Sequence, residues 1–258
     1  MSSILAERDG AVLRVTLNRP DVRNAFDEGT IAALDSLTAE AAQDRTLRAL
    51  VLAGSGRTFC AGADIGWMAK SIAYTQRENL SDAEDLARVL ERLDTLPFPV
   101  IGRIQGAALG GGVGLAAICD IAIADEGAVF ALSEVKLGIL PAVVAPYVIR
   151  KIGISAAREL FLTGRRFGAG RAREIGLVHE IVPASELDSA VGRHLSEIMT
   201  AGPHAIATAK ALIREIAGVH PNDVIGLTTN TIAAQRVSDE GQEGLRAFLE
   251  KRKPSWSG

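Results

Sequence analysis

Hydrophobic and polar residues alternate in AVLRVTLN, residues 11–18. This period of two predicts a strand with one buried face. Residues 27–44 instead repeat small or hydrophobic residues at helical spacing, and they begin with the acidic Asp27 and Glu28. Negative charge is favoured at the start of a helix because of the helix dipole, so this segment predicts a helix. The chain therefore opens with a strand followed by a helix.

The same alternation continues to about residue 200. A helix with leucines on one face is expected at residues 80–96, where Pro97 and Pro99 end it. Short apolar runs predict strands at residues 48–53, 100–104, 121–124 and 129–132. After Pro203 only helices are predicted, at residues 203–217, 223–237 and 239–252. We expect an α/β protein with a core formed by residues 1–200 and a helical region formed by residues 201–258.

Composition narrows the class of partner. The chain has 258 residues, of which 48% are hydrophobic, and a formal net charge of -3. It has no block of five or more Lys and Arg residues, so we expect no nucleic-acid partner. The longest uncharged run, between Arg103 and Asp120, is shorter than the roughly 20 residues that cross a bilayer, and no signal peptide is visible, so we expect no membrane contact. A soluble cytoplasmic protein that acts on small molecules is expected.

The segment LGGGVGLAAICD, residues 109–120, begins an apolar helix with glycines, although each interior Gly costs about 1 kcal/mol relative to Ala. Unpaired N–H groups at a helix start can hold an oxygen that gains negative charge. A second loop of small residues, GRTFCAGADIGWM at residues 56–68, offers further free N–H groups. Together the two loops could form an oxyanion hole. Close packing of the helix against a strand explains the glycines equally well.

Glu134 lies between apolar flanks in AVFALSEVKLGILPAVVAP, residues 128–146. Apolar surroundings raise the pKa of a carboxyl group, which can then exchange a proton near neutral pH. The alternative is a surface glutamate that caps a helix or pairs with Lys136. Neither the cysteines nor the histidines have the spacing of metal ligands, so we expect no metal; these residues are Cys60, Cys119, His179, His194, His204 and His220. Core packing is the expected role of Trp67, Met68 and Tyr74.

Taken in order, several motifs resemble the enoyl-CoA hydratase/isomerase family, also called the crotonase superfamily. They are NRPDVRNAF, FCAGADI, IQGAALGGGVGLAAICDIAIA, FALSEVKLGILP, TGRRFGAGRAREIGLVHEIVP and AFLEKRKPSW. The resemblance implies an α/β fold with a crotonase-like spiral of ββα units and a C-terminal helical region. It implies an acyl-CoA site in residues 1–200, and trimerisation and closure of the coenzyme A site by residues 201–258. It also implies a homotrimer or dimer of trimers that needs no separate cofactor, because coenzyme A enters as part of the substrate.

Motif positions imply roles for individual residues. The amides of Ala63 and Gly111 would hold the thioester oxygen, and Glu134 matches the second catalytic glutamate of the family. Contacts with coenzyme A are implied for Arg23, Ala25, Ala61, Asp64, Ile65, Lys253 and Trp256, of which the last two often reach a neighbouring subunit's ligand. One position departs from the pattern: Gly114 stands where two-glutamate hydratases have their first glutamate.

Three functions remain open for a site with one carboxyl group. Glu134 could act alone in the reversible addition of water to a 2-enoyl-CoA; the string LSEVKLGILPAVVAPYV is similar to bacterial hydratases of branched, methylglutaconyl-type thioesters. Isomerisation of a 3-enoyl-CoA to a 2-enoyl-CoA also needs only one base. The third function is acyl-CoA binding without catalysis, which the presence of Glu134 beside both candidate oxyanion loops disfavours.

Overall fold

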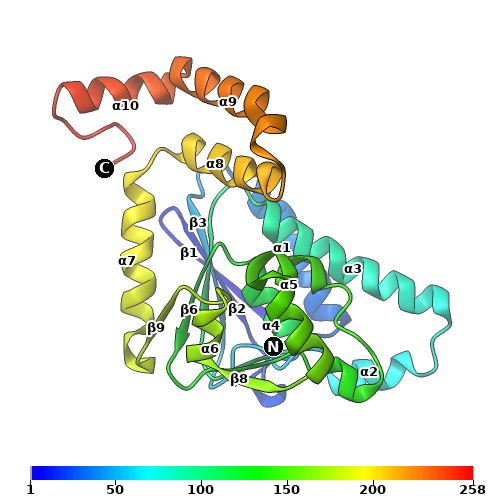
Figure 1. The fold of residues 1–258 in the computed structure, drawn as a ribbon. Helices are drawn as coiled ribbons and strands as arrows, with labels where there is room; N and C mark the ends of the chain where they lie inside the picture. Colours follow the sequence, from blue (N-terminus) through cyan, green and yellow to red (C-terminus); the bar gives the residue numbers. More distant parts are fainter. Residues whose placement is uncertain (1, 258) are drawn as a thin grey trace.

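Two sheets organise the chain in the computed structural model, which describes residues 2–257 (Figure 1). The larger sheet has the order β1-β2-β3-β4-β6-β9; β1 and β2 pair antiparallel, and the other neighbours pair parallel. The smaller sheet has the order β5-β7-β8. The strands are β1 (Ile4–Asp9), β2 (Val12–Leu17), β3 (Ala49–Gly54), β4 (Val100–Ile104), β5 (Ala107–Leu109), β6 (Ile121–Asp125), β7 (Val129–Ala131), β8 (Arg166–Gly168) and β9 (Glu180–Val182).

Helices follow the strands, and several of them begin at residues with favourable capping chemistry. Asp27 accepts a hydrogen bond from the Thr30 N–H at the start of α1, at 2.9 Å, and Thr75 and Glu78 form a capping box at the start of α3. The helices are α1 (Glu28–Gln43), α2 (Ile65–Ser71), α3 (Gln76–Thr95), α4 (Gly111–Ile118), α5 (Ala145–Thr163), α6 (Ala169–Glu174), α7 (Leu187–Thr200), α8 (Pro203–Ile216), α9 (Ile225–Val237) and α10 (Asp239–Leu249), with 3-10 turns η1 (Pro20–Val22), η2 (Glu134–Leu137), η3 (Ala184–Glu186) and η4 (Pro221–Val224).

Successive units of the chain place one strand in each sheet and then a helix. β4 leads to β5 and then to α4, and β6 leads to β7 and then, after η2, to α5. The turn between β4 and β5 contains Gly106, whose φ is +67° and whose backbone passes too close to the Arg57 carbonyl oxygen for any side chain. This arrangement confirms the predicted α/β spiral of ββα units.

Most predicted elements are confirmed, with shifts of a few residues at their ends. The predicted strands correspond to β2, β3, β4, β6 and β7, and the predicted helices to α1, α3, α8, α9 and α10. Several elements were not predicted: β1, β5, β8, β9, α2, α5, α6 and α7. β1 has no alternation to detect because only its first residue, Ile4, is buried.

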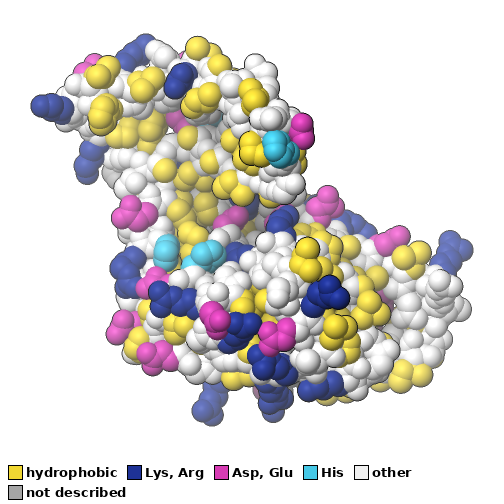
Figure 2. Space-filling model, in the orientation of Figure 1, with side chains coloured by type: hydrophobic (Ala, Val, Ile, Leu, Met, Phe, Trp, Pro, Cys, Tyr) yellow, Lys and Arg dark blue, Asp and Glu magenta, His cyan; other side chains and the backbone are white. Residues whose placement is uncertain are grey.

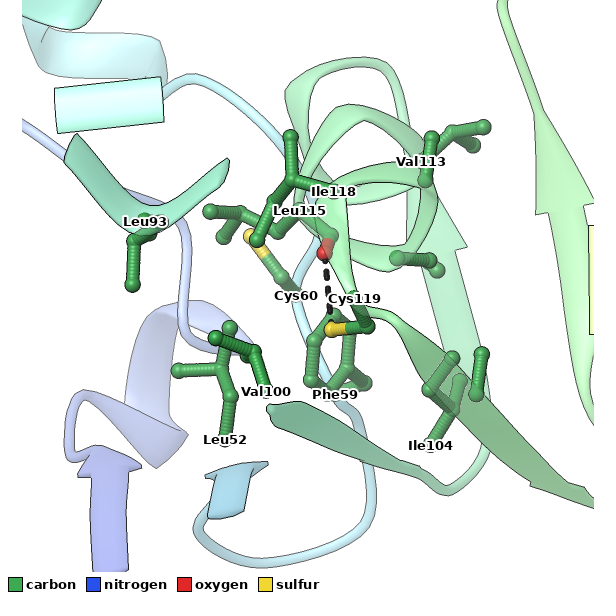
Figure 3. Close-up of a cluster of buried hydrophobic side chains, with 14 of the residues drawn as sticks. Leu52, Phe59, Cys60, Leu93, Val100, Ile104, Val113, Leu115, Ile118 and Cys119 are labelled. Carbon is green, nitrogen blue, oxygen red and sulfur yellow. Dashed lines mark hydrogen bonds between the residues drawn. The ribbon is translucent and has the colours of Figure 1, made fainter. Parts of the chain in front are cut away.

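The main hydrophobic core surrounds α4. Figure 3 shows Leu52, Leu93, Val100 and Leu115 converging from β3, α3, β4 and α4. Cys119 belongs to the same cluster, and its thiol donates a hydrogen bond to the Leu115 carbonyl oxygen at 3.1 Å. Because α4 is packed on several sides, its first turn has a fixed position relative to the neighbouring loops.

Both cysteine side chains are buried and unreactive. Cys60 and Cys119 are free thiols in the core. Burial raises the pKa of each thiol to about 12, and a thiol that stays protonated is a poor nucleophile.

The other face of the larger sheet carries a second, smaller core beneath α7, which includes Val51, Ile101 and Val191.

Helices α8, α9 and α10 form an arm that projects from the core (Figure 1). Ala247 is the one buried residue among the described parts of these helices. Large apolar side chains remain exposed on the arm, including Phe248 at 80% and Val237 at 77%. Figure 2 shows hydrophobic side chains along the arm and in the hollow between the arm and the core.

Residues 2–257 contain no helix with the length and apolar character needed to cross a lipid bilayer.

Candidate active site

A cavity of about 1040 Å³ opens where segments distant in sequence meet. Its lining comes from residues 21–26, residues 61–68, the facing parts of α2 and α3, residues 109–111 and residues 133–144. The cavity therefore joins the two glycine-containing loops and the Glu134 segment singled out from the sequence.

Two backbone amides in this cavity are free. Neither the Ala63 N–H nor the Gly111 N–H has a hydrogen-bond acceptor within the described chain, and both residues line the cavity. The neighbours of Ala63 are engaged: Phe26 donates its N–H to the Gly62 carbonyl oxygen and accepts from the Asp64 N–H, each at 2.9 Å. Gly111 begins α4, and an amide in the first turn of a helix has no acceptor in its own helix.

Glycines let the two loops approach closely. A Cβ atom on Gly62 would lie 2.8 Å from the Leu109 carbonyl oxygen and 3.6 Å from the Gly111 nitrogen. On Gly112, it would lie 3.0 Å from the Cys60 Cβ and overlap the Cys60 carbonyl oxygen. Close packing therefore explains these glycines, which was one of the two interpretations given in the sequence analysis. The same packing brings the free amides of Ala63 and Gly111 into one cavity, so the two interpretations are compatible.

Glu134 begins η2, directly after the short strand β7 and Ser133. Its Oε1 lies 3.0 Å from the position that a Cβ on Gly110 would occupy, next to the start of α4. Its Oε2 is buried and has no hydrogen-bond partner within residues 2–257. Loss of hydration by burial raises the pKa of Glu134 above its usual value of 4.5. The predicted upward shift is confirmed, and no described ion pair joins Glu134 to Lys136.

Val144 covers the neighbouring part of α4. It lines the cavity and is only 4% exposed. A Cβ atom on Gly114 would lie 2.7 Å from the Val144 Cβ and overlap its Cγ1. The space beside Gly114 is thus filled by an apolar side chain. Val144 was not singled out from the sequence, because its contact with α4 depends on how α5 packs.

The cavity gathers most of the residues to which the resemblance assigned a role. Eight of them line it: Arg23, Ala25, Ala61, Ala63, Asp64, Ile65, Gly111 and Glu134. Asp64 also caps α2, accepting a hydrogen bond from the Gly66 N–H at 2.8 Å. Its other oxygen lies 3.1 Å from Arg19 Nη2, which also pairs with Asp27 at 3.0 Å. Arg19 was not singled out from the sequence.

Lys253 and Trp256 lie elsewhere in the chain. Neither is among the residues that line the cavity. Trp256 donates its indole N–H to the Thr200 carbonyl oxygen at 3.1 Å, at the junction between α7 and the arm. Their contact with coenzyme A, which the resemblance places at a neighbouring subunit, stays a prediction.

Trp67 and Met68, for which a role in core packing was predicted, also face the cavity. Both line the cavity, although Trp67 also packs against the hydrophobic core and its ring centre lies 6.1 Å from that of Phe26. The indole N–H of Trp67 donates to Asp82 Oδ2 at 3.0 Å, which fixes the ring at the cavity wall. Tyr74 and the four histidines are not among the lining residues.

Fold and site together define a class: an α/β spiral in which a buried carboxyl group shares a cavity with two free backbone amides. The chain belongs to the enoyl-CoA hydratase/isomerase family of the crotonase superfamily, whose model matches residues 7–258. The family acts on acyl-CoA thioesters, and the protein is an enzyme of this family.

Known relatives cover the whole chain. It is 33% identical over 267 residues to the 2,3-dehydroadipyl-CoA hydratase of Escherichia coli K12, which covers 100% of both chains. It is 31% identical over 255 residues to the short-chain-enoyl-CoA hydratase of Clostridium acetobutylicum, covering 98% of this chain and 97% of the relative. The crystal structure of an enoyl-CoA hydratase from Shewanella pealeana matches with a TM-score of 0.95 at 41% identity, covering 98% of this chain and 96% of the other.

Proposed function

We propose that the protein catalyses the reversible addition of water to a 2-enoyl-CoA thioester. Glu134 is the only carboxyl acid/base in this proposal, and the N–H groups of Ala63 and Gly111 form the oxyanion hole. The observation that carries it is the shared cavity, where a buried Glu134 oxygen without a partner lies with two amides that have no acceptor among the described residues. Hydratase names among the relatives support the choice of reaction.

One carboxyl group can complete this reaction. Ionised Glu134 takes a proton from water while the water oxygen bonds to C3 of the enoyl group. The electron pair of the double bond moves towards the thioester, whose oxygen becomes negative and is held by the two amides, each worth about 3 kcal/mol in such a site. The protonated Glu134 then returns its proton to C2. One water is consumed, and the carboxyl group regains its charge.

We infer that coenzyme A lies along the part of the cavity lined by Arg23, Ala25, Ala61, Asp64 and Ile65. The acyl chain then extends past Glu134 towards Trp67 and Met68. A branched acyl group of the methylglutaconyl type is the first candidate, because the segment that resembles hydratases of such thioesters, residues 132–148, supplies one wall of the cavity.

An acyl-CoA panel tests the proposal. Purified protein is incubated with short, long and branched 2-enoyl-CoAs, and loss of absorbance by the conjugated thioester is followed together with hydroxyacyl-CoA formation by mass spectrometry. We expect reversible hydration of at least one member, and the preferred member defines the acyl group. A silent panel would refute the hydratase and leave the isomerase and the acyl-CoA-binding function, the latter measured by equilibrium binding of the same thioesters.

Isomerisation of a 3-enoyl-CoA to a 2-enoyl-CoA is the second candidate. The apolar cover that Val144 forms beside Glu134 favours it, since moving a proton from C2 to C4 needs one base and no water. This reaction would create absorbance by the conjugated thioester, the opposite sign to hydration. The mass of the product, unchanged for isomerisation and increased by one water for hydration, separates the two reactions.

We also propose that the enzyme assembles as a homotrimer or a dimer of trimers through its C-terminal arm. The arm exposes apolar side chains that the single chain leaves uncovered, among them Ile213, Val237, Phe248 and Leu249. Covering them with another copy removes apolar surface from water. Light scattering should give a mass of three or six chains, and a monomeric mass at micromolar concentration would contradict the proposal.

A further inference from the structure

We propose that Val144 determines how the reaction at Glu134 divides between addition of water and movement of the double bond. Its methyl groups keep the space between Gly114 and Glu134 free of polar groups, and this limits hydration. The inference rests on the proposed function, because it concerns the same carboxyl group. It adds a residue that sets the outcome of the reaction without itself taking or giving a proton.

The first step of the argument is the position of Val144 relative to Glu134. Both side chains contact α4, and their contact points are one helical turn apart: Glu134 Oε1 lies against Gly110 and Val144 lies against Gly114. The Gly114 N–H reaches the Gly110 carbonyl oxygen at 3.4 Å, which marks that turn. A water molecule bound at Glu134 therefore meets the wall that Val144 forms.

The second step concerns the other polar groups of the cavity. The segments that lie against Glu134, residues 110–114 and residues 139–144, contain no ionisable side chain. Lys136, on the same turn as Glu134, packs its side chain against Gly164. The remaining ionisable residues of the described lining are Asp21, Arg23, Asp64 and Asp82, of which Asp64 pairs with Arg19 and Asp82 accepts from Trp67.

The third step is the requirement of water itself. A buried water molecule is held by two to four polar partners. When the thioester oxygen occupies the two amides, Glu134 and the hydroxyl group of Ser133 are the polar side chains left in this part of the cavity. Water is then weakly held, whereas a C–H proton passes between substrate and Glu134 without any further partner. A polar or smaller side chain at position 144 should favour hydration.

The experiment compares Val144→Thr with Val148→Thr. Val148 makes a matched control because it is fully buried one turn further along α5 and is not among the cavity-lining residues. The readout is the ratio of hydroxyacyl-CoA formation from a 2-enoyl-CoA to double-bond migration in the corresponding 3-enoyl-CoA. Val144→Thr should raise this ratio about tenfold, the effect of one added hydrogen bond. Val148→Thr should lower stability and leave the ratio unchanged.

Val144→Ala is the second variant, because it opens space for water without adding a polar atom. It should also raise the ratio. Both variants should shift the acid limb of the pH profile of kcat/KM to lower pH, because water or a hydroxyl group near the carboxylate stabilises its charge. Unchanged ratios and acid limbs in both variants, with an active wild type, would overturn the inference alone. A wild type that catalyses neither reaction would overturn the proposed function and this inference with it.

Discussion

Replacing Gly114 by alanine tests how tightly α4 packs against the start of α5. The new methyl group would lie 2.7 Å from the Val144 Cβ and overlap its Cγ1, whereas carbon atoms in contact are normally about 3.5–4.0 Å apart. Crowding of this kind costs about 1–3 kcal/mol, and the better helix propensity of alanine offsets about 1 kcal/mol. We therefore expect Gly114→Ala to lower the free energy of unfolding by up to about 2 kcal/mol.

The same substitution should behave differently once Val144 is glycine. Val144→Gly removes every atom that the new methyl group would meet at less than 3 Å, so only the gain in helix propensity remains. In this background Gly114→Ala should be neutral or stabilise by up to about 1 kcal/mol. The cost of Val144→Gly itself cancels in the double-mutant cycle, which should give a coupling energy of about 2 kcal/mol, as contacting residues do.

Urea unfolding of the four proteins at one protein concentration measures these free energies, provided that the m-values agree. Gly192→Ala is the matched control: Gly192 lies within α7, and a Cβ there meets nothing within 4 Å. It should stabilise by up to about 1 kcal/mol. If Gly114→Ala costs the same with valine and with glycine at position 144, the packing argument is refuted.

Glu134→Gln should reduce kcat/KM for 2-enoyl-CoA hydration by about 100-fold or more; near-normal turnover would remove Glu134 from the mechanism. At pH 8 the same variant should unfold at a higher temperature than the wild type, because burial raises the pKa of Glu134 and stability is lost as its carboxyl ionises. Wild-type kcat/KM should fall as the pH drops through that pKa, with a midpoint above 4.5; a midpoint at or below this value would contradict it. Gly114→Glu should fold only together with Val144→Gly, and faster hydration by this double variant than by Val144→Gly alone would show that a second carboxyl group limits the water reaction.

Local patterns in the sequence predicted the elements that have one clear face. β2 buries Val15 and Leu17 on either side of the partly exposed Thr16, and α3 has a strongly amphipathic sequence that buries Val89, Leu90 and Leu93. β8 and β9 are only three residues long, too short for a period to emerge. α2 has no buried residue, since its inner face borders the cavity. Such elements exist because of their tertiary neighbours, which a local pattern does not contain.

The same distinction applies to the candidate site. The loops around Ala63 and Gly111 and the Glu134 segment were found because small residues and an isolated carboxyl group are visible within a few positions. Val144 and Phe26 could not be found this way. Each matters through a neighbour far away in sequence: Val144 against Gly114, and Phe26 against Gly111, where a Cβ would overlap its ring.

The functional groups of the cavity come from two parts of the polypeptide, the backbone and a side chain. Its free amides belong to the polypeptide backbone, and close glycine contacts with the Cys60 and Leu109 carbonyl groups hold them in place. Its proton-exchanging group is a side chain, which a single codon change replaces. A descendant of this chain could therefore exchange one reaction for another while the two amides that bind a carbonyl oxygen are retained, since among point mutations only a change to proline removes a backbone N–H.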